Sequence, residues 1–143
     1  TVAACVERAG SRHELNSSEI IKLQEMMRNC LYSSLLQEAR SAFLAGKRVW
    51  RELPVVRQSG DQTGAGTIEA GRIDLLFEGE EGWVLLEFKT DRVDSLTTDS
   101  EQGLRDRYGP QVREYADILS DLGVRVASGF LLLAHNGSTV QVI

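Results

Sequence analysis

The spacing of apolar residues predicts two helices in the first third of the chain. Asn16 with Glu19 three residues later forms a capping-box pattern that starts a helix. Its apolar residues recur at helical spacing at Ile20, Leu23, Met27 and Cys30. Ser34 and Gln37 repeat the capping pattern, and Gly46 is placed to end the second helix. Residues 1–16 show no clear period and are predicted to form a tail or linker.

From residue 49 onward the period changes to that of strands. Residues 49–56 are predicted to form a strand in which Pro54 marks an edge or an end. A turn-rich loop follows over 58–66. Residues 67–78 and 83–90 are two further strands, and the four residues between them, Gly-Glu-Glu-Gly, make a hairpin connection.

The last third of the chain returns to a helix and closes with a hairpin. Residues 92–103 are expected to form an exposed loop. A helix is predicted over 103–121, kinked at Pro110 or beginning nearer Gly109. Its apolar stripe is Leu104, Tyr108, Val112, Tyr115, Ile118 and Leu122. Residues 124–134 and 138–143 are expected to pair across a turn that holds His135.

The central hairpin has a register that its hydrophobic pattern favours. If Glu78 pairs with Trp83, one face becomes wholly apolar. The pairs on that face are Ile73 with Phe88, Leu75 with Leu86, and Phe77 with Val84. The same register sets Asp74 opposite Glu87 on the other face, and Lys89 projects from that face because it follows Glu87 by two residues.

Two acids and a lysine on one face suggest a cation site. Like charges directly across a strand pair destabilise a sheet, whereas a divalent cation between them converts the repulsion into ligation, which suits Mg²⁺. The alternative is a solvent-exposed face with an ordinary lysine–carboxylate pair. Gln111 and Tyr115 lie four residues apart on one face of the last helix, and the acid–lysine site could supply the polar partners that they need.

Composition limits the function. The chain has 143 residues, 42% of them hydrophobic and 26% charged, which is typical of one soluble globular domain. A net charge of −5 argues against a stand-alone domain that coats nucleic acid, but not against a catalytic module delivered to it by a larger neighbour. The two cysteines are expected to be reduced thiols. Apolar runs are too short to span a membrane, and a secretory pattern is missing at the start of the sequence.

Three segments together resemble a known superfamily. Gly-Arg-Ile-Asp at 71–74, Glu-Phe-Lys-Thr at 87–90 and the Gln111-x-x-x-Tyr115 spacing resemble the PD-(D/E)XK nucleases. More narrowly, residues 49–143 resemble the C-terminal nuclease domain of bacterial AddA/RecB-type (UvrD/Rep-like) helicase–nucleases. The resemblance implies an α/β, restriction-endonuclease-like fold with a central mixed sheet flanked by helices, over residues 17–143.

The resemblance also implies the site and its chemistry. Asp74 and Glu87 would be ligands of Mg²⁺ or Mn²⁺, and Lys89 the catalytic lysine. Gln111 and Tyr115 would position that lysine or a DNA phosphate. Lys89 is expected to hold water and stabilise transition-state charge, with cleavage leaving 5′-phosphate and 3′-hydroxyl ends.

One ligand of the family's site has no match. The family supplies a metal-binding His from a Gly-x-x-x-His helix that is missing here, so we expect an N-terminally truncated fragment whose third ligand lies upstream of Thr1. His13 and Glu52 are weaker candidates, and solvated surface residues are the alternative for both. Four arginines could contact the DNA backbone or be ordinary surface charge: Arg92, Arg105, Arg107 and Arg113.

The expected function is that of a Mg²⁺-dependent deoxyribonuclease (exonuclease) domain in an ATP-dependent helicase–nuclease. The parent protein is expected to act in double-strand-break repair in the bacterial cytoplasm. The isolated fragment is expected to be weakly active or inactive. Expected partners are DNA, helicase domains of the same parent chain and a second helicase–nuclease chain, with no membrane. One alternative is a degenerate nuclease fold that binds DNA ends or assembles subunits. Another is a restriction-enzyme-like or junction-resolving nuclease.

Overall fold

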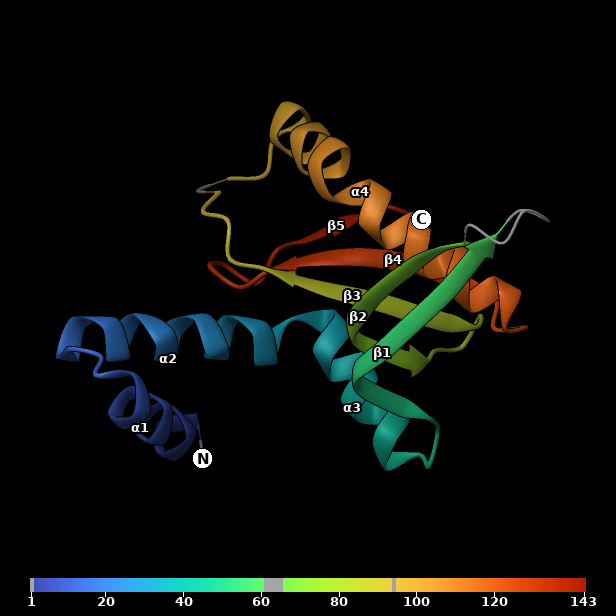
Figure 1. Ribbon diagram of the computed structural model, residues 1–143. Coiled ribbons are helices and arrows are strands. Elements are labelled where there is room, and N and C mark those ends of the chain that lie inside the picture. Colours follow the sequence, from blue (N-terminus) through green and yellow to red (C-terminus); the bar gives the residue numbers. More distant parts are fainter. Residues whose placement is uncertain (1, 61–65, 94) are drawn as a thin grey trace.

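The computed structural model describes residues 2–60, 66–93 and 95–143. Within them the chain forms four helices and a five-stranded mixed sheet (Figure 1). The elements are α1 (Val2–His13), α2 (Ser17–Tyr32), α3 (Ser34–Leu44), β1 (Val49–Gly60), β2 (Gly66–Glu78), β3 (Trp83–Lys89), α4 (Thr98–Asp121), β4 (Val126–Leu133) and β5 (Thr139–Gln141). The α/β class predicted from the sequence is confirmed.

The strands lie in chain order, β1-β2-β3-β4-β5. Strands joined by a hairpin are antiparallel, whereas β3 and β4 are parallel because α4 carries the chain across between them. The predicted pairing in both hairpins is confirmed at Leu75↔Leu86 and at Leu131↔Val140.

Helices cover both faces of the sheet, and each face has its own core (Figure 1). The α4 core contains Leu85, Val112 and Leu131, each without exposed surface. The α3 core contains Leu35, Phe77 and Leu86. The prediction of one apolar and one polar hairpin face is therefore wrong, because α4 buries the face that was expected to be polar.

The first two strands exchange their faces at the level of Asp74. Ile73 lies in the α4 core, whereas Leu75 lies in the α3 core, although both would share a face in a regular strand. The residue of β1 opposite Asp74 is Glu52, which has a positive φ of 53°. Glu52 and Asp74 do not pair in the ladder, whereas the residues before and after them pair in one unchanged register. The predicted Ile73–Phe88 contact is consequently wrong, since Phe88 packs on the α3 core.

The helix boundaries show where local sequence signals were correct. Asn16 caps α2 in a full capping box with Glu19. The cap of α3 is Ser33 and not Ser34, because the Ser33 hydroxyl accepts the N–H of Leu36. This helix ends as predicted, with Gly46 at φ 77° in the left-handed region that glycine favours.

Two segments expected to be irregular are helical. Residues 2–13 form α1, which packs against α2, and Val6 has no exposed surface. The expectation of an irregular tail is wrong there, while the domain division at residue 17 stays a prediction. Helix α4 begins at Thr98, inside the predicted loop 92–103, because Thr97 and Ser100 form a capping box.

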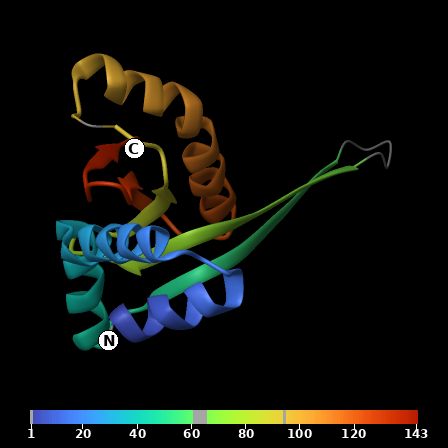
Figure 2. The same cartoon turned by 90° about the vertical axis from the view of Figure 1, so that its left-hand side faces the viewer.

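Pro110 lies inside α4 and does not start it. Figure 2 shows the helix bending partway along its length, as expected where proline removes a backbone donor. Of the predicted stripe, Leu122 is 69% exposed at the helix end, and Leu119 is buried in its place.

Past the α4 core, the end of β1 and the start of β2 form a two-stranded arm that projects from the rest of the molecule (Figure 2), and Val56 and Ile68 on it are exposed. Of the predicted loop 58–66, residues 58–60 belong to β1 and Gly66 to β2, and residues 61–65 lie outside the described residues. His135 lies in the turn between β4 and β5, as predicted.

Candidate functional site

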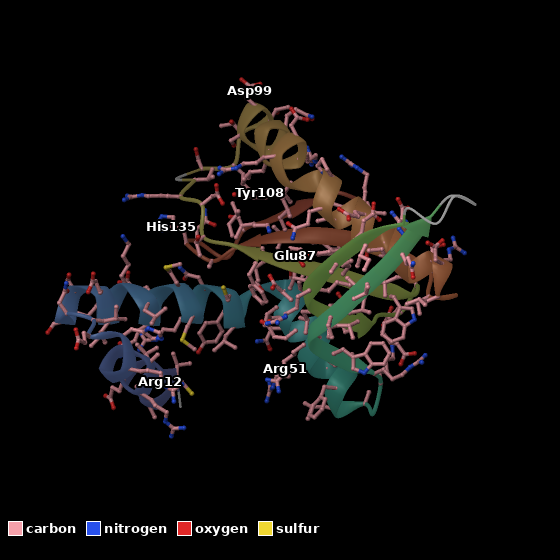
Figure 3. All side chains as sticks on the ribbon, in the orientation of Figure 1. Arg12, Arg51, Glu87, Asp99, Tyr108 and His135 are labelled. Atoms are coloured by element: carbon pink, nitrogen blue, oxygen red, sulfur yellow. The ribbon has the colours of Figure 1, made fainter. Side chains whose placement is uncertain are left out.

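The five residues predicted to form the site come together beneath α4, at the end of the β2–β3 ladder. Asp74 belongs to β2, Glu87 and Lys89 to β3, and Gln111 and Tyr115 to α4. Figure 3 shows Glu87 on the sheet below the helix. The proximity of the five residues is observed, whereas their catalytic roles stay a prediction.

Asp74 and Glu87 meet through crossed hydrogen bonds and not through a regular ladder pair. The Asp74 N–H donates to Glu87 Oε1 over 3.2 Å, and the Phe88 N–H donates to Asp74 Oδ2 over 2.8 Å. The ladder ends at Leu75↔Leu86. Side-chain oxygens therefore accept N–H groups at the point where the two strands part, and both acids are fixed there.

Glu87 is a buried carboxylate. It is 2% exposed, and burial together with the nearby charge of Asp74 raises its pKa. The ammonium group of Lys89, with Nζ 3.4 Å from Glu87 Oε2, acts in the opposite direction. A buried acid with a raised pKa beside a second acid is an arrangement common at functional sites.

A chain of hydrogen bonds fixes Lys89 to the helix. Its Nζ donates to Gln111 Oε1 over 3.0 Å, and Gln111 Nε2 donates to the Tyr115 hydroxyl over 3.0 Å. The same hydroxyl accepts the N–H of Arg72 over 3.3 Å. Gln111 and Tyr115 thus link the lysine to the backbone of β2.

Gly71 makes room for this chain. A Cβ atom at position 71 would lie 2.5 Å from Tyr115 Cε1 and 2.7 Å from its hydroxyl oxygen. Its place three residues before Asp74 was part of the family resemblance, but the sequence did not show the reason.

Tyr108 contacts Lys89, and Asp91 contacts Tyr108. Neither contact was predicted from the sequence. The ring centroid of Tyr108 lies 4.6 Å from Lys89 Nζ, and the Tyr108 hydroxyl donates to Asp91 Oδ2 over 2.8 Å, which raises the pKa of the phenol. The sequence pattern places Tyr108 in the apolar stripe and does not predict this contact. Its position three residues before Gln111, on the same helix face, was the available signal.

The donor set suits a hard divalent cation. Asp74 and Glu87 offer carboxylate oxygens side by side, and such a cation would favour the ionised form of Glu87 that burial disfavours. Among the described residues no group of three or more His, Cys, Asp or Glu side chains could hold a metal. His13 is an exposed residue at the end of α1, and Glu52 is exposed and paired with Arg72 at 3.4 Å.

Two of the arginines named as DNA contacts, Arg105 and Arg107, form ion pairs within the chain. Arg105 pairs with Glu101 at 2.9 Å, and Arg107 pairs with Asp91 at 2.9 Å. Arg92 and Arg113 are exposed. A DNA contact by any of the four stays a prediction.

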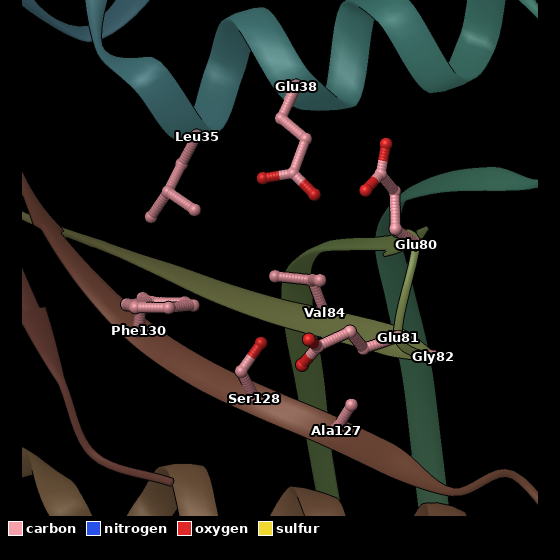
Figure 4. A pocket seen from close by; sticks show the side chains of 9 residues that line it. All are labelled: Leu35, Glu38, Glu80, Glu81, Gly82, Val84, Ala127, Ser128 and Phe130. Atoms are coloured by element: carbon pink, nitrogen blue, oxygen red, sulfur yellow. The ribbon is translucent and has the colours of Figure 1, made fainter.

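A separate cavity of about 370 Å³ lies on the α3 side of the sheet (Figure 4). Three glutamates contribute to its lining, Glu38, Glu80 and Glu81. Its walls belong to α3, the β2–β3 turn, the start of β3 and β4, and none of the five predicted site residues lines it.

Comparisons with known proteins relate the chain to one bacterial enzyme. It is 34% identical over 120 residues to the ATP-dependent helicase/nuclease AddA of Lysinibacillus sphaericus, and 35% identical over 138 residues to that of Heliobacterium modesticaldum. These matches cover 78% and 88% of this chain but 9% of each relative. A third, from Clostridium perfringens, is 32% identical over 124 residues.

Other comparisons add little. No family model matches the chain. The crystal structure of SSO0001 aligns with 96% of this chain and 61% of its own, at 17% identity and a TM-score of 0.47, too low to define the fold. Within the described part of the chain, no helix is long and apolar enough to cross a membrane. The chain is thus distantly homologous to a region of the ATP-dependent helicase/nuclease AddA.

Proposed function

We propose that this chain is the metal-dependent nuclease module of a bacterial helicase–nuclease, with a restriction-endonuclease-like core, and that it hydrolyses phosphodiester bonds of DNA. The observation that carries the proposal is the hydrogen-bonded set of Asp74, Glu87 and Lys89 under α4. Homology to part of a helicase/nuclease supports the same assignment.

Asp74 and Glu87 would hold Mg²⁺ or Mn²⁺. Such an ion, when bound, supplies charge neutralisation at the phosphate and lowers the pKa of the attacking water. The crossed hydrogen bonds with the strands fix both carboxylates before any ligand arrives.

Lys89 would contribute a fixed positive charge. Glu87 and Gln111 each accept a hydrogen bond from its ammonium group, which has three N–H donors. A donor remains for a phosphate oxygen or the attacking water. Lys89 is therefore placed to stabilise developing negative charge.

The first experiment measures nicking of labelled duplex and single-stranded DNA with Mg²⁺ or Mn²⁺, and DNA binding in EDTA. Asp74→Asn and Glu87→Gln should abolish cleavage because each removes a ligand charge. DNA binding without metal should be unchanged or slightly tighter, since each change removes a charge that repels phosphate. If wild-type protein, tested both as this chain and as its longer parent, binds DNA but never cuts it, the result would favour the degenerate nuclease fold that only binds DNA.

A second readout is thermal stability without DNA. Because the pKa of Glu87 is raised in the folded protein, the ionised side chain lowers the free energy of unfolding as pH rises from the ordinary glutamate value through the raised one. Glu87→Gln should therefore raise the Tm at pH 7 in EDTA. Mg²⁺ should raise the Tm of the wild type and leave that of Glu87→Gln unchanged.

A further inference from the structure

The ammonium group of Lys89 lies against an aromatic ring that the proposed chemistry does not use. Besides Glu87 and Gln111, its neighbour is Tyr108 of α4, whose ring centroid is 4.6 Å from Nζ. The lysine side chain is 13% exposed. A cation this close to a ring face, and this far out of water, is attracted by the ring's negative face.

The ring itself is held in place. The Tyr108 hydroxyl donates to one oxygen of Asp91, and the guanidinium group of Arg107 donates to the other, at 2.8 and 2.9 Å. Arg107 also lies 5.0 Å from the ring centroid. Asp91 follows Lys89 by two residues, so these bonds tie the end of β3 to the helix that carries Tyr108.

We propose that Tyr108 is a positioning residue for Lys89: its ring fixes the ammonium group beside Glu87, and Asp91 fixes the ring. The contact follows from the geometry alone, whereas its effect on cleavage rests on the proposed nuclease function. The competing role is plain packing in the apolar stripe, where Leu104 and Val112 lie on either side of Tyr108 along the helix. A flexible lysine stem has many rotamers, so loss of the ring should let the amine leave the site.

A spectroscopic experiment tests the contact without any nuclease assay. The chain contains three lysines, Lys22, Lys47 and Lys89, so ¹³Cε-lysine labelling gives three resolvable sets of signals. The Hε signal of Lys89, assigned by its loss in Lys89→Arg, should lie upfield because of the ring current of Tyr108. Tyr108→Leu should move it to the position of a solvated lysine.

Two variants separate the ring from its anchor. Tyr108→Phe removes the hydroxyl donor of the Tyr108–Asp91 hydrogen bond and Asp91→Ala removes its acceptor. Both variants keep the ring, so both should give an intermediate shift. Tyr32→Leu, at a tyrosine that is 80% exposed, is the matched control and should change nothing. A Lys89 signal that does not move in Tyr108→Leu would overturn the proposal. If Tyr108→Leu fails to fold, an unmoved signal in Asp91→Ala would overturn it instead.

A kinetic experiment tests the consequence. Tyr108→Leu should lower kcat about 10-fold, with KM for DNA and the Mg²⁺ concentration for half-activity unchanged within about twofold, and Tyr108→Phe should recover most of the loss. In a Lys89→Ala background, Tyr108→Leu should have no further effect on residual cleavage or on metal binding, because it acts through the lysine. If the effects of Tyr108→Leu and Lys89→Ala on cleavage add up in the double variant, the positioning role is contradicted. If neither this chain nor its longer parent cleaves DNA while the lysine signal behaves as expected, the nuclease assignment fails and the positioning role stands.

Discussion

At the scale of single residues, the candidate site depends on a close approach between Gly71 and Tyr115. The tyrosine hydroxyl reaches the N–H of Arg72 because position 71 has no side chain. The same hydroxyl accepts from Gln111, which accepts from Lys89. One missing methyl group thus allows the hydrogen-bond chain that holds the lysine.

Gly71→Ala should therefore displace Tyr115 and lower the free energy of unfolding by about 1–3 kcal/mol, the usual cost of forcing an atom into a packed site. The measurement is urea denaturation followed by far-UV circular dichroism. Gly103→Ala, in α4 with open space around the new methyl group, is the control and should gain about 0.5–1 kcal/mol. Equal stability of Gly71→Ala and the wild type would contradict the role of this contact.

At the scale of elements, α1 and α2 form a helical pair to one side of the sheet (Figure 1). A Cβ at Gly10 would lie 3.2 Å from Ile20, so the two helices approach closely there. Helix α2 has no fully buried residue among those described. Its stability therefore depends on partial burial together with the capping box at its start.

Asn16→Ala should cost about 1 kcal/mol of local helix stability, because it removes the acceptor of two backbone N–H groups. Hydrogen exchange should accelerate in α1 and the first turns of α2 and stay unchanged in β3. Ser17→Ala, at an exposed neighbour, should leave exchange as in the wild type. Uniform acceleration across the sheet would show that the pair is not a separate unit.

At the scale of the whole molecule, β3 joins two cores that face opposite ways. Leu85 lies in the α4 core and Leu86 in the α3 core, and neither has exposed surface. The stability of both layers therefore depends on one central strand.

Leu85→Ala and Leu86→Ala should each lower the free energy of unfolding by about 2–5 kcal/mol and keep one cooperative transition. Circular dichroism and the fluorescence of the stacked Trp50 and Trp83, 5.2 Å apart, should report the same midpoint. Leu44→Ala, at a side chain that is 71% exposed, should change stability by about 0.5 kcal/mol or less. Separate midpoints for the two probes would show that the layers unfold independently.

Several elements could be predicted from local signals along the chain. Capping at Asn16, the stop at Gly46 and the pairing around Leu75 and Leu86 each depend on residues a few positions apart or on one short hairpin. The choice of Asp74, Glu87 and Lys89 as one group followed from the same register.

The environment of that group depends on tertiary packing. The bond from Lys89 to Gln111 spans 22 residues and that from Arg72 to Tyr115 spans 43, and both exist only because the crossover helix packs on the sheet. The same packing buries Glu87 and raises its pKa, and it places Tyr108 over the lysine. The exchange of faces at Glu52 and Asp74 interrupts the period from which register was predicted. Local pattern could therefore identify the residues of the site, whereas their burial, bonding and remaining neighbours depend on contacts between distant segments.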